Sequence, residues 1–63
     1  NAEDFFYGLG KYGAQDFADG LGENAKFFAW GLHENAQACA RILVAKGVSN
    51  EVIAKLTGIN WNH

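Results

Sequence analysis

Few residues in this chain could do catalytic or metal chemistry, and their spacing keeps them apart. His33 and Glu34 are adjacent, so on a helix their side chains would point about 100° apart and could not readily bind one metal ion. Gln37 follows His33 by four residues, but glutamine is a poor metal ligand. Asp16 and Asp19 are better explained as a helix cap and a first-turn charge. We therefore expect neither a catalytic group nor a metal site.

The single cysteine and the paired glycines also give no cofactor signal. Cys39 has no second cysteine with which to form a disulfide or a metal pair. It falls on the apolar side of a predicted helix, where a free cysteine behaves as a small hydrophobic residue. The pairs Gly8/Gly10 and Gly20/Gly22 lack the third glycine and the preceding strand of a dinucleotide-binding loop. We expect no cofactor, and we expect the chain not to be an enzyme.

Composition indicates one small domain with a surplus of aromatic side chains. The chain has 63 residues, of which 49% are hydrophobic, including five Phe, two Tyr and two Trp. A domain of this size buries only about 60% of its unfolded surface, so its stability is marginal without help. Either the core packs these aromatics densely or a partner covers some of them.

Charge excludes several classes of partner. The net charge is −2, and the sequence has no run of Lys or Arg. Nucleic-acid binders normally carry a basic stripe, and helices that bind anionic lipid carry a basic face. No apolar run approaches the roughly 20 residues that span a bilayer. We expect no membrane span and place the domain in the cytoplasm.

The first residues suggest a piece of a longer protein. The sequence contains no Met and begins with Asn1 and Ala2, which resemble the remnant left when a purification tag is cleaved. We expect residues 3–63 to form a single helical domain excised from a longer chain.

The longest periodic stretch predicts one central helix from Asn24 to Lys46. Apolar residues recur there at spacings of three and four along one side. Trp30 falls among the polar residues of the opposite side, and Phe27 belongs to a second, narrower apolar strip. Either flanking helices or a partner should therefore cover more than one side. The main apolar side comprises Ala25, Phe28, Ala29, Leu32, Ala36, Cys39, Ala40 and Leu43.

Two shorter helices are predicted before this central helix. The first spans Glu3 to Tyr12, with Asp4 as its cap and Gly13 as its stop. The second spans 16–21 with Asp16 as its cap and ends at Gly22. A kinked continuation into the central helix is the alternative there, because glycine weakens a helix without forbidding it.

A short helix with clear end signals is predicted after the central one. Ser49 is a good N-cap, and Val48 can pack against Ile53 as a hydrophobic staple. Gly58 should end this helix in the left-handed conformation, with Ile59 making the apolar contact that accompanies such an ending.

The pattern Phe-x-x-Gly-Leu occurs three times, with spacings of 12 and 11 residues. We interpret it as repeated helix packing, in which Phe and Leu fill grooves and Gly lets another backbone approach. A cofactor box of Phe-Gly type is the alternative. The three copies start at Phe5, Phe17 and Phe28, and their glycines are Gly8, Gly20 and Gly31.

The stretch from Leu43 to Ile59 resembles bacterial helix-turn-helix segments. It is also similar to the C-terminal tails of the recombination-promoting nuclease and putative transposase family. The residues that carry this resemblance are Gly47, Ser49, Ile53, Ala54, Thr57 and Gly58.

The resemblance implies a helix-turn-helix shape for the C-terminal pair of helices. In DNA-reading members the turn leads into a recognition helix, whereas here residues 60–63 follow and include no Lys or Arg. The catalytic carboxylates and lysine of the nuclease family have no counterparts here. DNA binding is implied only if the parent protein continues or a partner supplies the basic surface.

We therefore expect an all-α domain, a small bundle of about four helices around the central helix 24–46. The expected function is a non-catalytic protein-interaction or self-association module of a larger bacterial protein, which binds a protein partner or a second copy. The alternatives are a helix-turn-helix-like element of a DNA-associated protein and a structural accessory domain of a larger enzyme. Nucleic acid is not expected to bind this chain alone. Exposed aromatics often anchor interfaces, so the candidate contacts are Tyr7, Tyr12, Phe27, Trp30 and Trp61.

Overall fold

The computed structural model describes residues 1–60, and this part of the chain is built from helices without strands. The all-α prediction is confirmed. Two short 3₁₀ turns, η1 (Gly22–Asn24) and η2 (His33–Asn35), separate the middle helices. The α-helices are α1 (Ala2–Gly8), α2 (Lys11–Leu21), α3 (Ala25–Leu32), α4 (Ala36–Ala45) and α5 (Asn50–Thr57).

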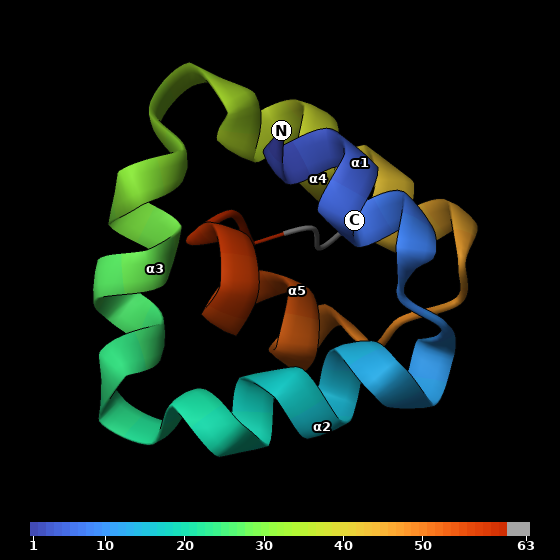
Figure 1. The fold of residues 1–63 in the computed structure, drawn as a ribbon, viewed down its shortest axis with the longest axis horizontal. Helices are drawn as coiled ribbons and strands as arrows, with labels where there is room; N and C mark the ends of the chain where they lie inside the picture. The colour runs from blue at the N-terminus through green and yellow to red at the C-terminus, as the bar shows by residue number, and fades with distance from the viewer. Residues whose placement is uncertain (61–63) are drawn as a thin grey trace.

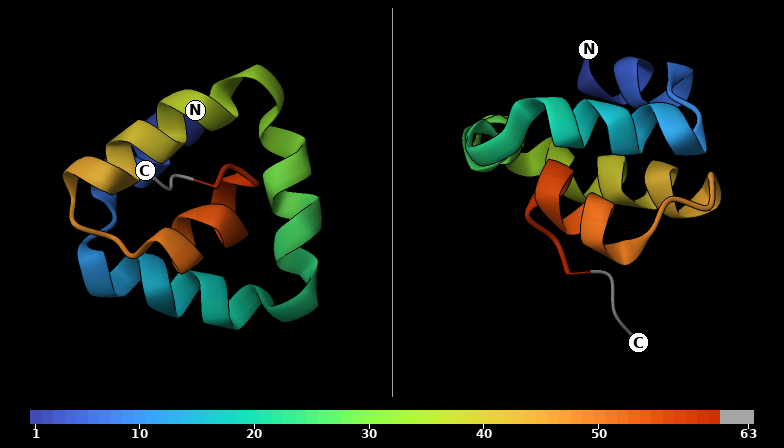
Figure 2. Two further views of the ribbon diagram at one scale, coloured as in Figure 1. Left: turned by 180° about the vertical axis from the view of Figure 1, so that it is seen from behind. Right: turned by 90° about the horizontal axis from the view of Figure 1, so that it is seen from below.

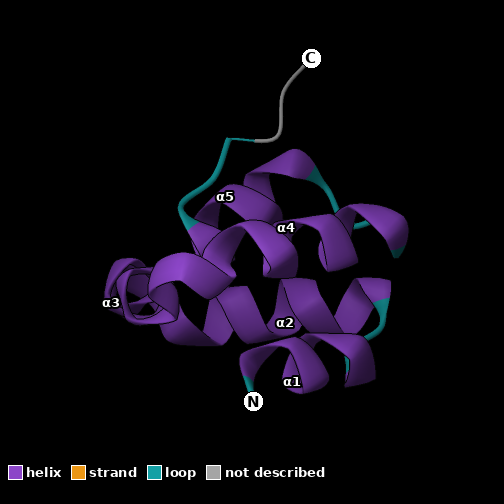
Figure 3. Ribbon diagram, turned by 90° about the horizontal axis from the view of Figure 1, so that it is seen from above, coloured by secondary structure: helices purple, strands orange, loops and turns teal. Residues whose placement is uncertain are grey.

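Helices α2, α3 and α4 form three sides of an open frame, and α5 fills it (Figure 1). Helix α5 contacts all three of them, while α1 packs on α4. The view from behind shows α5 crossing the frame (Figure 2). The view from above shows α1 and α5 on opposite sides of the domain (Figure 3). The organising element is therefore the short α5, because it is the one on which the three framing helices converge.

The prediction of one long helix from Asn24 to Lys46 is wrong. The chain turns sharply at His33, whose φ of 51° and ψ of −125° cannot continue a helix. The spacing of three and four persists across this corner because Leu32 and Ala36, on its two sides, both pack toward the core. The periodicity therefore identified the buried side correctly but could not reveal that the helix is broken.

The boundary between the first two helices also differs from the prediction. Helix α1 ends at Gly8 and α2 begins at Lys11, so Gly13 lies inside α2. The break falls at Leu9, whose backbone is extended with φ −85° and ψ 135°. Its N–H still donates to the carbonyl of Phe6, which completes the last turn of α1.

The N-terminal caps are different residues from those predicted. The side-chain oxygen of Asn1 accepts from the backbone N–H of Asp4 at 2.9 Å, so Asn1 and not Asp4 caps α1. Asp16 lies in the middle of α2 and caps nothing, because that helix starts five residues earlier at Lys11. Both errors follow from placing the helix boundaries too late in the sequence.

The signals around α5 are confirmed in detail. Ser49 caps the helix by accepting from the N–H of Val52 at 3.4 Å, and Gly58 adopts the left-handed conformation with φ 73°. The Thr57 hydroxyl donates to the carbonyl of Ile53 at 2.6 Å and accepts from the N–H of Ile59 at 3.2 Å. These bonds close the C-terminal turn of α5.

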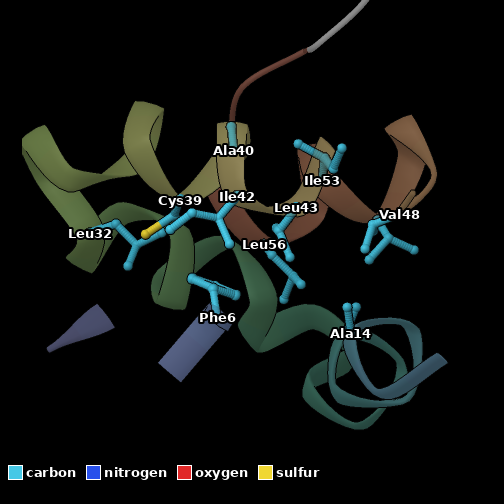
Figure 4. Close-up of a cluster of buried hydrophobic side chains, with 12 residues drawn as sticks. Phe6, Ala14, Leu32, Cys39, Ala40, Ile42, Leu43, Val48, Ile53 and Leu56 are labelled. Atoms are coloured by element: carbon cyan, nitrogen blue, oxygen red, sulfur yellow. The ribbon is translucent and has the colours of Figure 1, made fainter. Parts of the chain in front are cut away.

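The core gathers side chains from all five α-helices around a common centre (Figure 4). Its largest fully buried side chains are Phe6, Leu43, Ile53, Leu56 and Cys39. Val48 is also buried, as expected of a residue paired with Ile53 in a hydrophobic staple.

The three phenylalanines of the repeated pattern meet in one cluster. Phe17 lies between Phe5 and Phe28, with ring centroids 5.0 and 5.1 Å away. Phe6 closes the cluster, because its ring lies 5.5 Å from Phe5 and 5.9 Å from Phe28. All four contacts are edge-to-face, the favourable geometry for aromatic rings. The repeat is therefore a packing device at its phenylalanine positions.

The prediction that the glycines of the same repeat allow close approach of another backbone is wrong. A β-carbon built at Gly8, Gly20 or Gly31 would meet nothing within 4 Å. Each lies in the last turn of its helix, beside open space. The packing interpretation is therefore wrong for these three residues.

Candidate functional site

The two corners that flank α3 are built from nearly the same six residues. Segments 20–25 and 31–36 are identical except that Gly22 in the first is replaced by His33 in the second. Gly22 has φ 55° and ψ −130°, and His33 has φ 51° and ψ −125°. Each corner continues into a 3₁₀ turn and then a helix that starts with alanine. The chain thus uses one local structure twice, eleven residues apart.

His33 occupies a backbone conformation that suits glycine. It is the one residue other than glycine with positive φ in segment 1–60. A side chain in such a region costs of order 1–3 kcal/mol, and strain of this kind is often found at functional sites. Since the matching corner uses Gly22, the strain at His33 comes from its side chain and is not required by the corner itself. This makes His33 a candidate functional residue.

A groove of about 600 Å³ runs between α3 and α5 beside these corners. Its wall on α3 includes Ala25 and Ala29, and its wall on α5 includes Ala54. Small residues also bring the walls together, because a β-carbon at Gly58 would lie only 3.8 Å from the Ala29 β-carbon. The groove is lined by Gly22, Glu23, Ala25, Lys26, Ala29, Trp30, His33, Ala36, Ala54, Lys55, Thr57 and Gly58.

Longer polar and aromatic side chains line the same groove. Trp30 belongs to it and remains 74% exposed, so most of the indole has no covering within segment 1–60. The charged lining residues are Glu23, Lys26 and Lys55. Two of the five basic residues of the chain thus lie here but only one of its seven acidic residues. The local balance of charge is therefore opposite in sign to the net charge of −2.

Four of the five predicted contact residues are exposed, but the structure does not place them at one site. The exposed fractions are 64% for Tyr7, 75% for Tyr12, 58% for Phe27 and 74% for Trp30. The fifth, Trp61, lies outside the described residues.

Of the four candidates within residues 1–60, only Trp30 lines the α3–α5 groove. Tyr7 lines a second, smaller hollow of about 360 Å³ with residues of α4 and Lys46. The ammonium groups of Lys11 and Lys26 lie 5.8 and 5.3 Å from the ring centres of Tyr12 and Phe27. Cation–π contacts of this kind at the surface are weak and leave the rings accessible.

The groove contains little that could act on a substrate. The Thr57 hydroxyl has its hydrogen donated to Ile53 within α5. Cys39 is buried outside the groove, and burial, with a smaller effect from Glu3, raises the pKa of its thiol. Within residues 1–60, no three His, Cys, Asp or Glu side chains are grouped so that they could hold a metal ion.

Sequence reasoning missed most of the groove. The repetition of Gly-Leu-x-Glu-Asn-Ala at 20–25 and 31–36 was the available signal for the corners. This repetition shows that His33 occupies the position equivalent to Gly22, where the first corner uses glycine for its positive φ. The pairing of α3 with α5 had no comparable local signal.

No protein-family model, curated protein or solved structure matches this chain. No helix within residues 1–60 has the length and apolar character needed to cross a membrane.

Proposed function

We propose that the domain is a non-catalytic protein-interaction module that binds its partner through the α3–α5 groove. The observation that carries this proposal is the exposed Trp30 beside a groove lined with alanine and glycine. Tryptophan is the residue type most enriched among side chains that dominate binding energy, and it acts by filling a desolvated pocket.

The size of Trp30 makes it a strong anchor. A buried aromatic side chain removes about 150–250 Å² from water. Covering the exposed three quarters of this indole would then contribute about 3–4 kcal/mol before the costs of association. That contribution is large beside the marginal stability expected of a 63-residue domain.

The arrangement of polar groups also supports a protein partner. Interfaces have an apolar centre surrounded by polar residues. In the groove, alanines occupy both walls, and Lys26 and Lys55 supply long, flexible charged side chains. Such groups can contact a partner's acidic or amide groups around the apolar centre.

Site-specific photo-crosslinking tests this proposal. A photo-reactive phenylalanine analogue would replace Trp30 in one variant and Tyr12, equally exposed but outside the groove, in the matched control. Illumination of the protein at high concentration and in extract of its native cells should crosslink position 30 to a polypeptide and leave position 12 largely uncrosslinked. Equal crosslinking at both positions, or none at position 30, would contradict the assignment of the groove.

A further inference from the structure

We infer that the partner is a second copy of this chain, related by a two-fold axis, so that Trp30 of each copy enters the α3–α5 groove of the other. This inference rests on the proposed function and adds the identity of the partner.

The projecting Trp30 side chain and the α3–α5 groove lie on one face of the domain. Trp30 is itself a lining residue of the groove that its counterpart would fill. In a two-fold interface the same patch serves both copies, so a projecting group and a receiving hollow must lie side by side. A rotation about an axis beside Trp30 would seat both indoles at once.

The receiving groove has the right size and chemistry for an indole. Its volume of about 600 Å³ exceeds that of one side chain, which leaves room for the indole and for the groups that flank it. Ala25, Ala29 and Ala54 present small apolar side chains on both walls. An aromatic ring can lie flat between such residues without displacing a large side chain.

Charge complementarity also supports a second copy of the chain as the partner. Glu23 lies at the η1 corner on the α3 side of the groove, and Lys55 lies on α5 across it. A two-fold axis through the groove exchanges these sides, so Glu23 of each copy can meet Lys55 of the other. The pairing of Glu23 with Lys55 is therefore self-complementary, although Lys26 leaves each groove with one positive charge in excess. Complementary charges of this kind fix orientation and suppress other pairings.

A stable dimer would need a large share of the surface of this small domain. A standard stable interface buries about 800 Å² per partner, which is about a fifth of the 4157 Å² surface of this domain. Phe27, one helical turn before Trp30 on α3, is also largely exposed and can extend the contact. We expect a dissociation constant in the range of about 10 μM to 1 mM.

Sedimentation equilibrium over a range of concentrations tests the dimer. The wild-type protein should shift from monomer to dimer within that range. Trp30→Ala should weaken association at least about tenfold, as expected for an anchor residue, whereas Tyr12→Ala should leave it unchanged within about twofold. Circular dichroism should show native helix content in both variants, since both side chains are exposed.

Charge exchange provides a sharper test of the two-fold arrangement. Glu23→Lys alone should place like charges opposite each other at both symmetric positions and weaken its homodimer, and so should Lys55→Glu alone. An equimolar mixture of the two variants restores an opposite-charge pair at both positions. The mixture should therefore associate at least about tenfold more tightly than either variant by itself.

Two results would overturn the dimer: a wild-type protein that stays monomeric at about 1 mM, or a mixture no tighter than the separate variants. Crosslinking at position 30 then separates this inference from the proposed function. A monomeric protein that crosslinks there to a different polypeptide keeps the function and loses the self-association. A protein that crosslinks to nothing at position 30 loses both.

Discussion

His33 and Gly22 form an internal comparison, because the same corner is built twice with a single difference. At the residue scale this separates what a corner needs from what its side chain adds. The backbone needs a positive φ at both places, and glycine satisfies that need without strain.

Replacing His33 with glycine should stabilise the fold. The substitution removes strain of order 1–3 kcal/mol from the folded state. The greater conformational freedom of glycine also stabilises the unfolded chain, which offsets about 1 kcal/mol of this gain. We expect His33→Gly to raise the free energy of unfolding by about 1 kcal/mol, measured by urea denaturation. Gly22→Ala is the matched control and should lower it. A less stable His33→Gly protein would mean that the imidazole makes stabilising contacts that outweigh the strain.

Cys39 should make stability depend on pH in the alkaline range. Its thiol is fully buried, and burial raises its pKa above that of the unfolded chain. The contribution of this group is therefore fully present below the unfolded pKa of roughly 8.5 and is lost as pH rises above it. The free energy of unfolding should fall as the pH rises above about 8.5, with a slope of at most about 1.4 kcal/mol per pH unit.

The control for Cys39 is the Cys39→Ala variant. It should be less stable at neutral pH, because it loses a buried sulfur, and it should lack that part of the alkaline slope. A slope unchanged by the substitution would contradict the assignment of the effect to Cys39.

At the element scale, the helices owe their positions to tertiary contacts more than to local propensity. Gly20 and Gly31 lie one residue before the ends of α2 and α3, and a β-carbon at either would meet open space. Glycine there weakens its helix without any gain in packing.

Alanine at these two positions should therefore stabilise the domain. We expect Gly20→Ala and Gly31→Ala each to add about 0.5 kcal/mol and to raise the midpoint of thermal unfolding by a few degrees. Gly58→Ala is the comparison, because Gly58 has a φ of 73° and its substitution should destabilise by about 1 kcal/mol. A loss of stability in Gly20→Ala would show a close contact at that position.

The sequence predicted the helices and their buried sides better than their breaks. The spacing of three and four assigned Cys39 and Leu43 to the core, where the structure places both. The corner at His33 was missed because a histidine does not by itself mark the end of a helix; its signal was the match of residues 31–36 to residues 20–25. The aromatic surplus led to Trp30, but the groove beside it depends on how α3 meets α5. That pairing is tertiary information, which local periodicity does not contain.

At the scale of the whole molecule, α5 holds the frame together. Ile53 and Leu56 of this helix are fully buried, and α5 is in contact with α2, α3 and α4. A cavity here would weaken every one of those contacts at once.

Ile53→Ala should therefore unfold most of the population. Truncating a buried isoleucine costs about 2–5 kcal/mol, while a domain of this size has only about 3–5 kcal/mol of core stability. Circular dichroism at 25 °C should show loss of most helical signal, whereas Lys55→Ala, on the same helix but exposed, should leave it intact. A cooperative native-like transition in Ile53→Ala would show that the frame stands without α5.

The position of α5 in the sequence determines when this domain can fold during its synthesis. Domains generally fold as units while the ribosome synthesises them, yet here the helix that occupies the centre follows the three helices that frame it. Until residues 50–57 have been translated, the frame has only solvent where Ile53 and Leu56 will lie. The nascent chain must therefore expose the apolar side chains of α2, α3 and α4 that pack on α5 until that helix emerges.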